Sequence, residues 1–231
     1  MNMDTLEAAL DYANPDVIAK FRREFSVSPE EALDIFSETK KWLWFAANSK
    51  VEGVSIYRAT QIIDEMWHTF ITFTVDYAQY CESRFGRYLH HIPLTQEALR
   101  SAQRQFEADP QSYKNDRAKR VHAELSEIQR LLGEETLIKW LVIFREKYSP
   151  EICDALALSA LKAREREVNP PISTGSSTIP QLIKPSGDRL VDQLVDLAMD
   201  GPQNYPKCDF GLPGSGGGGG APDCRTTIHN P

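Results

Sequence analysis

Residues 62–71 read Ile-Ile-Asp-Glu-Met-Trp-His-Thr-Phe-Ile, and they lie at the centre of the most apolar segment of the chain, from about residue 56 to residue 85. If this segment is a helix, apolar side chains cover nearly every side of it, which is typical of a buried helix. Gly86 follows and can adopt the left-handed conformation that ends a helix. The segment therefore predicts one long central helix around which the rest of the chain packs.

The segments on both sides of the central helix also have a helical pattern, because apolar residues recur every three or four positions. One start is marked by Ser28, Pro29 and Glu31, which form a capping box with proline at the first helical position. We expect a loop or turn at residues 51–55 and helices at about residues 17–25, 29–48, 95–108, 111–132, 134–148 and 150–168. The pattern predicts an all-α fold, a multi-helix orthogonal bundle, as one helical domain over residues 1–168.

The composition changes after residue 168. Residues 169–187 are rich in Pro, Ser and Thr and cannot bury enough apolar surface to offset the entropy of ordering, so we expect a linker. Residues 188–200 carry an amphipathic pattern that is too short for a stable isolated helix, which predicts a helix docked on the body. Residues 201–231 include the glycine run at 216–220 and predict a disordered, Gly-rich flexible tail.

The overall charge narrows the class of protein. The 231 residues carry a formal net charge of -7 with a pI near 5.3, which argues against a surface that attracts nucleic acid or anionic lipid as a whole. Four cationic residues cluster at Lys114, Arg117, Lys119 and Arg120. This pattern is more typical of a solvated helix face than of a nucleic-acid site.

No stretch of the chain contains the about 20 consecutive apolar residues that a membrane span requires. The amino terminus has no secretory-signal pattern, and the cysteines are sparse for a disulfide scaffold. We therefore expect a soluble cytoplasmic protein in which Cys81 and Cys153 are reduced thiols in helices.

Asp64 and His68 are the sharpest chemical feature of the sequence. Because they are four residues apart on a helix, they project from one face, as a carboxylate and an imidazole must in order to share a metal ion or a proton. The same spacing also serves a hydrogen bond that satisfies a buried histidine. His90 and His91 follow the central helix and are candidates for a further ligand, with packing of a loop at the helix end as the alternative.

The length of the central helix limits which residues can join His68. Cys81 lies thirteen residues later, which is about 20 Å of rise and about 220° of rotation, so one continuous helix keeps the two side chains apart. To reach His68, the chain after residue 85 would have to run back along about 25 Å of helix. The five or six residues that lead to His90 and His91 span at most about 20 Å. The return becomes shorter if the helix breaks around residues 72–76, where β-branched residues are concentrated.

Two other kinds of site have no support in the sequence. No Gly-x-Ser-x-Gly elbow is present, and no cysteine has a plausible base beside it in the sequence, so no nucleophile constellation emerges. The glycine run lacks the Gly-Lys-Ser/Thr ending of a phosphate-binding loop.

Part of the chain, over about residues 35–95, is similar to a known family. The residues that carry the similarity are Trp42, 63–71, Tyr77, Cys81, 85–87 and 89–93. They resemble the glycine-rich domain-containing protein family, whose signature is an aspartate-x-x-tryptophan-histidine helix followed by tyrosine, cysteine and a histidine-bearing loop. The resemblance makes Trp67, Tyr77, Cys81 and Gly86 the core of the motif. It implies no defined chemistry, and the RNA-recognition domain of some plant members has no counterpart here.

The chain departs from this family in two ways. Phe70 stands where plant relatives tend to have a second histidine, which removes a potential metal ligand. Relatives can also be denser in cysteine in the tail, whereas this chain has Cys208 and Cys224 with fifteen residues between them, a poor spacing for a preformed zinc site. These two cysteines are candidates for modification or redox pairing.

The leading hypothesis from these features is a non-enzymatic interaction or accessory module. Its helical body would bind a partner, which we expect to be another protein, and its tail would act as a tether. The alternative is a metal-binding helical protein or metal-dependent enzyme that uses Asp64, His68, His90 and His91. We expect no cofactor under the first hypothesis and a divalent metal ion under the second.

Overall fold

The computed structural model describes residues 5–51, 54–92, 95–167, 190–199 and 224–226. Helices dominate this part of the chain, which confirms the predicted all-α fold. No described helix combines the length and apolar character that a membrane span needs. The predicted linker at residues 169–187 and most of the predicted tail at residues 201–231 lie outside the described residues.

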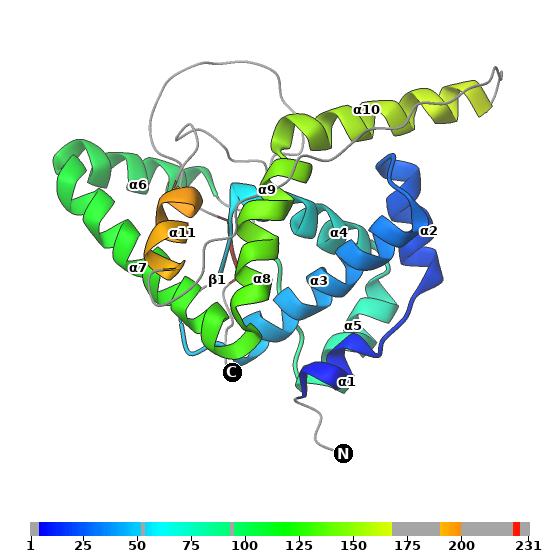
Figure 1. Cartoon of the computed structure of the whole chain (residues 1–231), viewed down its shortest axis with the longest axis horizontal. Coiled ribbons are helices and arrows are strands. Elements are labelled where there is room, and N and C mark those ends of the chain that lie inside the picture. Colours follow the sequence, from blue (N-terminus) through cyan, green and yellow to red (C-terminus); the bar gives the residue numbers. More distant parts are fainter. Residues whose placement is uncertain (1–4, 52–53, 93–94, 168–189, 200–223, 227–231) are drawn as a thin grey trace.

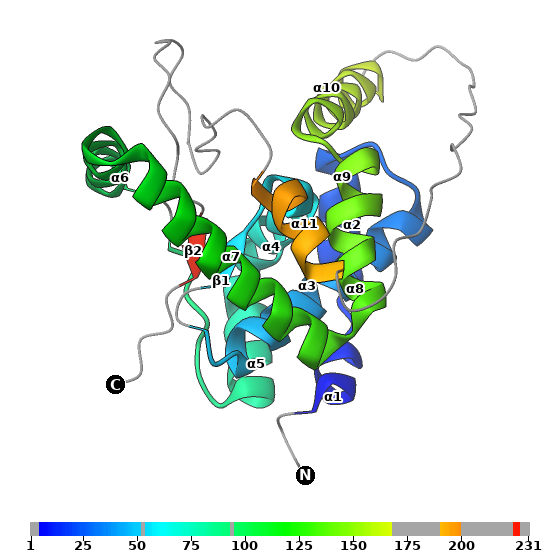
Figure 2. The ribbon, with the colours of Figure 1, turned by 60° about the vertical axis from the view of Figure 1, so that its left-hand side comes forward.

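The centre of the bundle is α4 (Gln61–Thr72), which is buried on most of its surface. Five of its apolar side chains have exposed fractions of 0 to 1 %, namely those of Ile62, Ile63, Met66, Trp67 and Phe70. The long helix α3 (Pro29–Asn48) packs against it, and Figures 1 and 2 place the two helices side by side. The predicted capping box is present at the start of α3, where Ser28 and Glu31 bond reciprocally.

The expected single helix from residue 56 to residue 85 is wrong, because the chain leaves the helical conformation at Phe73 (φ -85, ψ 64). A second helix, α5 (Thr74–Phe85), starts directly after it. The Phe73 amide donates to the Phe70 carbonyl at 3.0 Å, which tightens the last turn of α4. The Thr72 hydroxyl bonds the Thr69 carbonyl, and this local bonding competes with helix continuation. Ile56, where the expected helix begins, instead ends strand β1 (Val54–Ile56), and the 3-10 turn η1 (Arg58–Thr60) follows.

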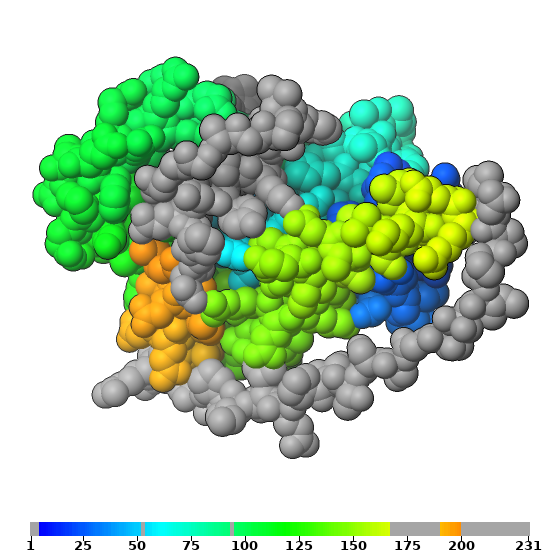
Figure 3. All heavy atoms as spheres, turned by 90° about the horizontal axis from the view of Figure 1, so that it is seen from above, coloured from blue at the N-terminus to red at the C-terminus, as the bar shows by residue number. Residues whose placement is uncertain are grey.

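The remaining elements surround this centre. In chain order they are α1 (Leu6–Leu10), α2 (Pro15–Glu24), α6 (Gln96–Ala108), α7 (Pro110–Leu132), α8 (Glu134–Ile138), the π-helical turn η2 (Lys139–Ile143), α9 (Phe144–Lys147) and α10 (Pro150–Glu167). Figure 3 shows α6 and α7 on one side of the molecule and α10 on the other.

The amphipathic pattern at residues 188–200 forms helix α11 (Leu190–Met199). It packs along α7, and both appear side by side in Figures 1 and 2. Its buried face consists of Leu190, Val191, Leu194 and Ala198. Burial of this face compensates for the low stability of so short a helix on its own.

Strand β1 pairs antiparallel with β2 (Cys224–Thr226), so that Val54 lies opposite Thr226 and Ile56 opposite Cys224. The sequence predicted a turn at residues 51–55 and a flexible tail at the position of β2. Strands of three residues are too short to produce a readable alternation of apolar and polar residues, which explains the difference.

Gly86 ends α5 in the left-handed conformation (φ 65), as predicted. A methyl group at this position would meet no heavy atom within 4 Å, so Gly86→Ala tests the backbone conformation alone. We expect this substitution to lower the free energy of unfolding by about 1 kcal/mol, measured by urea denaturation. Gly133 (φ 84, ψ 167) occupies a region that is almost exclusive to glycine, so Gly133→Ala should cost more. If both variants had the same free energy of unfolding as wild type, the backbone conformation would not be the reason for glycine at these positions.

Candidate metal site

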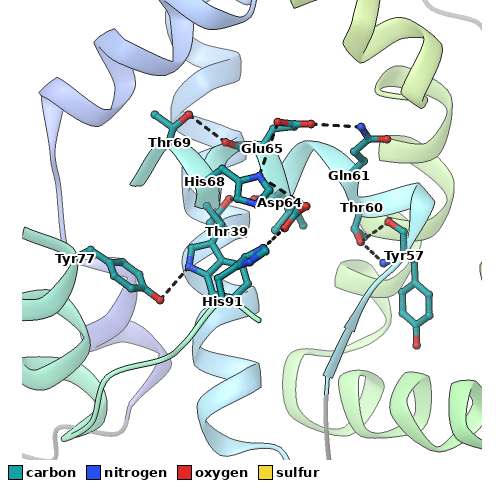
Figure 4. Close-up of polar contacts among 12 residues, drawn as sticks. Thr39, Tyr57, Thr60, Gln61, Asp64, Glu65, His68, Thr69, Tyr77 and His91 are labelled. Carbon is teal, nitrogen blue, oxygen red and sulfur yellow. Dashed lines mark hydrogen bonds and ion pairs between the residues drawn. The ribbon is translucent and has the colours of Figure 1, made fainter. Parts of the chain in front are cut away.

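Three candidate ligands meet at the exposed edge of α4. Asp64 and His68 project from the same face of this helix, and His91 reaches them from the segment after α5 (Figure 4). The His91 Nε2 atom lies 3.1 Å from Asp64 Oδ1, and His68 Nδ1 lies 3.9 Å from Asp64 Oδ2. Each residue offers one ligand atom to a group in which all separations are within 4.8 Å.

The burial of the three side chains differs. Those of Asp64 and His91 have exposed fractions of 7 % and 12 %, whereas that of His68 is 37 % exposed. Burial lowers the pKa of His68; the Asp64 carboxylate opposes this shift, and His91 adds to it. The cluster is therefore closed on the side of Asp64 and reaches solvent on the side of His68.

His90 lies outside the cluster, although the sequence left it and His91 as equal candidates. It is exposed, and its ring packs against Tyr88 with centroids 4.8 Å apart. The His91 ring instead contacts the rings of Trp67 and His68, each at a centroid distance of 4.5 Å.

The break at Phe73 is what brings His91 back to α4. The two helices that replace the expected single one pack against each other, so the segment after α5 does not have to retrace one long rod. The sequence allowed a shared site if the helix broke around residues 72–76, and the structure has a break at Phe73. Cys81 stays outside the cluster although the helix is broken, and it contacts the backbone of Leu89 and the Tyr77 side chain. Burial raises the pKa of the Cys81 thiol, and those two hydrogen bonds oppose the shift.

The residues of the sequence motif form a chain of hydrogen bonds beside the cluster. The Trp67 indole donates to the Tyr77 hydroxyl at 2.9 Å, and that hydroxyl donates to the Leu89 carbonyl at 2.7 Å. Trp67 and Tyr77 are buried, and burial raises the pKa of Tyr77, so its hydroxyl stays protonated. Trp42, another motif residue, packs on Trp67 with ring centroids 4.9 Å apart.

Glu65 is a nearby carboxylate that the sequence reasoning missed. Its Oε2 atom lies 4.0 Å from His68 Nδ1, and its other oxygen accepts a hydrogen bond from Gln61 at 3.4 Å (Figure 4). The spacing of three residues between Glu65 and His68 is the signal that could have identified it. Glu65 adds a second negative charge near the candidate ligands.

Two imidazoles and a carboxylate are a donor set that Zn²⁺ and Fe²⁺ accept, with positions left for water or substrate. Bonds of about 2.0 to 2.2 Å place neighbouring ligand atoms about 3 to 3.5 Å apart. The separation between His91 and Asp64 already falls in this range, whereas the separations to His68, which are 3.9 Å from Asp64 Oδ2 and at most 4.8 Å within the group, would have to shorten by up to about 1.8 Å. The His68 side chain is more exposed than those of Asp64 and His91, so fewer packed neighbours oppose this shift.

Comparison with known proteins gives one finding. The family model described as UCP032817-like matches residues 11–126, which is just over half of the chain and includes all three members of the cluster. The chain belongs to the UCP032817-like family. No curated protein and no solved structure matches the chain.

The UCP032817-like region begins just before α2 and ends within α7. It contains both helices of the broken central segment and the return of His91. The helices from α8 onward lie outside the match. The candidate metal site is therefore built entirely from the part of the chain that defines the family.

Proposed function

We propose that this protein binds a divalent transition-metal ion through Asp64, His68 and His91. The observation that carries the proposal is the convergence of three ligand atoms within 4.8 Å, although Asp64 and His91 are 27 residues apart in sequence. Such a separation means that the tertiary fold, and not helical spacing alone, brings the third group to the other two.

The environment of Asp64 supports a bound cation. Its side chain is 7 % exposed, and within the described part of the chain it forms no ion pair with a lysine or arginine. A buried carboxylate is costly unless a positive charge compensates it. A divalent ion would supply that charge for Asp64.

The competing explanation is structural. A hydrogen bond between Asp64 and His91 would satisfy both side chains without any metal ion. The two explanations differ over His68, which lies 3.9 Å from Asp64, beyond hydrogen-bond distance, yet within reach of a shared ion. Three protein ligands also leave a coordination position for water, which is the composition of catalytic zinc sites, so metal-dependent catalysis belongs to the same proposal.

Metal analysis of protein purified without an affinity tag tests the proposal. We expect close to one ion of zinc, iron or manganese per chain by elemental mass spectrometry. Adding Zn²⁺ at about 100 times its Kd to chelator-treated protein should raise the free energy of unfolding by about 2.7 kcal/mol. Protein that contains no stoichiometric metal and gains no stability from Zn²⁺, Fe²⁺ or Mn²⁺ would exclude a metal site.

The interaction module is a second candidate function, and helix α10 favours it. This helix extends away from the body in Figure 1, and it carries Leu158 and Leu161, which are 50 % and 45 % exposed. They lie one turn apart, so they share a side of the helix. A photo-crosslinking residue at position 158 should give one discrete adduct with a protein partner in cells, whereas the same residue at exposed position 107 should not. If both positions gave the same adducts, Leu158 would not belong to a specific partner-binding surface.

Two further expectations from the sequence belong to this proposal. The resemblance to the glycine-rich domain-containing family would make the chain a member of a group that shares the motif around Trp67 and Tyr77. A cytoplasmic location would keep the Cys81 thiol reduced. Fractionation of cells that express the full chain tests the location directly.

A further inference from the structure

The position of His91 needs an explanation, because no helix or strand holds this residue. It lies in the irregular segment after Gly86, where hydrogen bonds of regular secondary structure do not fix the backbone. Asp64 and His68, in contrast, are fixed by α4. A ligand on an irregular segment can contribute to a preorganised site only if other contacts hold it in place.

One set of contacts that holds this segment is the hydrogen-bond chain through Tyr77. The Tyr77 hydroxyl donates to the carbonyl of Leu89, two residues before His91, and it accepts from the Trp67 indole. The exposed fractions of Tyr77, Trp67 and Leu89 are 0 %, 1 % and 1 %. Water therefore cannot replace these bonds, and buried bonds of this kind are costly to break.

Trp67 links the same chain to the candidate ligands. It lies on α4 between Asp64 and His68, and its ring contacts the His91 ring at a centroid distance of 4.5 Å. One end of the hydrogen-bond chain is thus anchored on the helix that carries two ligands. The other end holds the backbone that carries the third.

We propose that Tyr77, together with Trp67, is a positioning residue that holds His91 against Asp64 through the Leu89 carbonyl. This inference rests on the proposed metal site for its function, but the geometry that it describes also exists in the metal-free protein. It gives the tryptophan and tyrosine of the sequence motif a role beyond filling the core. They set the angle and distance at which the third ligand approaches.

Tyr77→Phe tests this role because it removes one oxygen atom and keeps the ring. The matched control is Tyr80→Phe on the same helix, since Tyr80 is also buried and its hydroxyl donates to the Ala9 carbonyl at 3.2 Å, away from residues 89–91. We expect Tyr77→Phe to weaken Zn²⁺ binding by about 10- to 100-fold, the effect typical of losing an outer-shell contact. Tyr80→Phe should leave the Zn²⁺ affinity within about 2-fold of wild type, because its contact lies elsewhere.

A second measurement does not depend on metal. Diethylpyrocarbonate labels accessible imidazoles, and mass spectrometry separates His90 from His91. In metal-free Tyr77→Phe, the labelling rate of His91 should rise several-fold while that of the already exposed His90 stays constant. Circular dichroism should report an unchanged helix content. If Tyr77→Phe does not fold, Trp67→Phe removes the other member of the hydrogen-bond chain, the indole that donates to the Tyr77 hydroxyl, and it should also raise His91 labelling.

The two measurements separate the inference from the proposed function. If wild-type protein binds no Zn²⁺ but Tyr77→Phe still exposes His91 selectively, the positioning role stands and the metal site fails. If wild-type protein binds Zn²⁺ and Tyr77→Phe matches Tyr80→Phe in both affinity and labelling, the positioning role is wrong and the metal site stands.

Discussion

Replacing His91 by alanine is expected to lower the Zn²⁺ affinity of the protein by more than about 100-fold, because loss of a direct ligand should exceed the 10- to 100-fold effect of losing an outer-shell partner. His90→Ala is the matched control, since His90 is the adjacent residue, is exposed, and lies outside the cluster. Isothermal titration or competition with a chromogenic chelator measures both variants. Equal affinities would show that His91 is not a ligand.

Asp64→Asn extends the same test and separates the metal hypothesis from a structural hydrogen bond. The amide oxygen of asparagine can still accept from His91, but the buried negative charge is lost. Without metal, the variant should be at least as stable as wild type, because a buried charge is removed. With saturating Zn²⁺, wild type should become the more stable protein, since only it gains the full binding energy. A variant that matches wild type in stability both with and without Zn²⁺ would favour the structural explanation, because asparagine keeps the hydrogen bond to His91.

The positions of most helices could be predicted from apolar spacing and from end signals such as Ser28 and Gly86, because these act locally. The break at Phe73 could not, since apolar residues continue through Phe70, Phe73 and Val75 with no change of pattern. The dihedral angles of Phe73 change there, and α5 is then held by contacts that depend on the tertiary fold, such as the hydrogen bond from the Tyr80 hydroxyl to the Ala9 carbonyl. The β-branched residues nearby marked a weak point without fixing what happens at it.

The candidate site divides in the same way. Asp64 and His68 follow from helical spacing, because the relation between sequence and direction is fixed within a helix. The choice between His90 and His91 does not, since both lie on an irregular segment whose direction is set by the bond from Tyr77 to Leu89. That bond joins residues twelve positions apart and has no signature in the sequence alone.

Replacing Glu38 by alanine is expected to cause the largest loss of stability among these substitutions. Glu38 lies on α3 with an exposed fraction of 2 %, and it accepts a hydrogen bond from the Trp140 indole at 2.8 Å. Its other oxygen pairs with Lys41 and Lys139, each at 2.9 Å. Alanine leaves the buried indole N–H without an acceptor and both lysines without this carboxylate. We expect the free energy of unfolding to fall by about 2 to 4 kcal/mol.

Asp34→Ala is the matched control for this prediction. Asp34 pairs with the same Lys139 at 2.6 Å, but its side chain is 49 % exposed. Ion pairs at such a position contribute little, so the variant should stay within about 1 kcal/mol of wild type. Urea denaturation of both variants measures the difference. If Glu38→Ala and Asp34→Ala lowered the free energy of unfolding by similar amounts, the burial of the Glu38 contacts would not increase their contribution to stability.

The Glu38 contribution should also depend on pH. Burial by itself would raise the pKa of Glu38, but the bonds and charges of Lys41 and Lys139 outweigh it and hold the pKa below the ordinary value of 4.5. The folded protein therefore binds fewer protons at this site than the unfolded chain, so stability rises with pH through this range. The contribution is complete above pH 4.5 and is lost as the pH falls through the folded pKa. The stability gap between wild type and Glu38→Gln should accordingly narrow in acid, and a gap that is constant from pH 7 down to pH 3 would contradict an ionised Glu38.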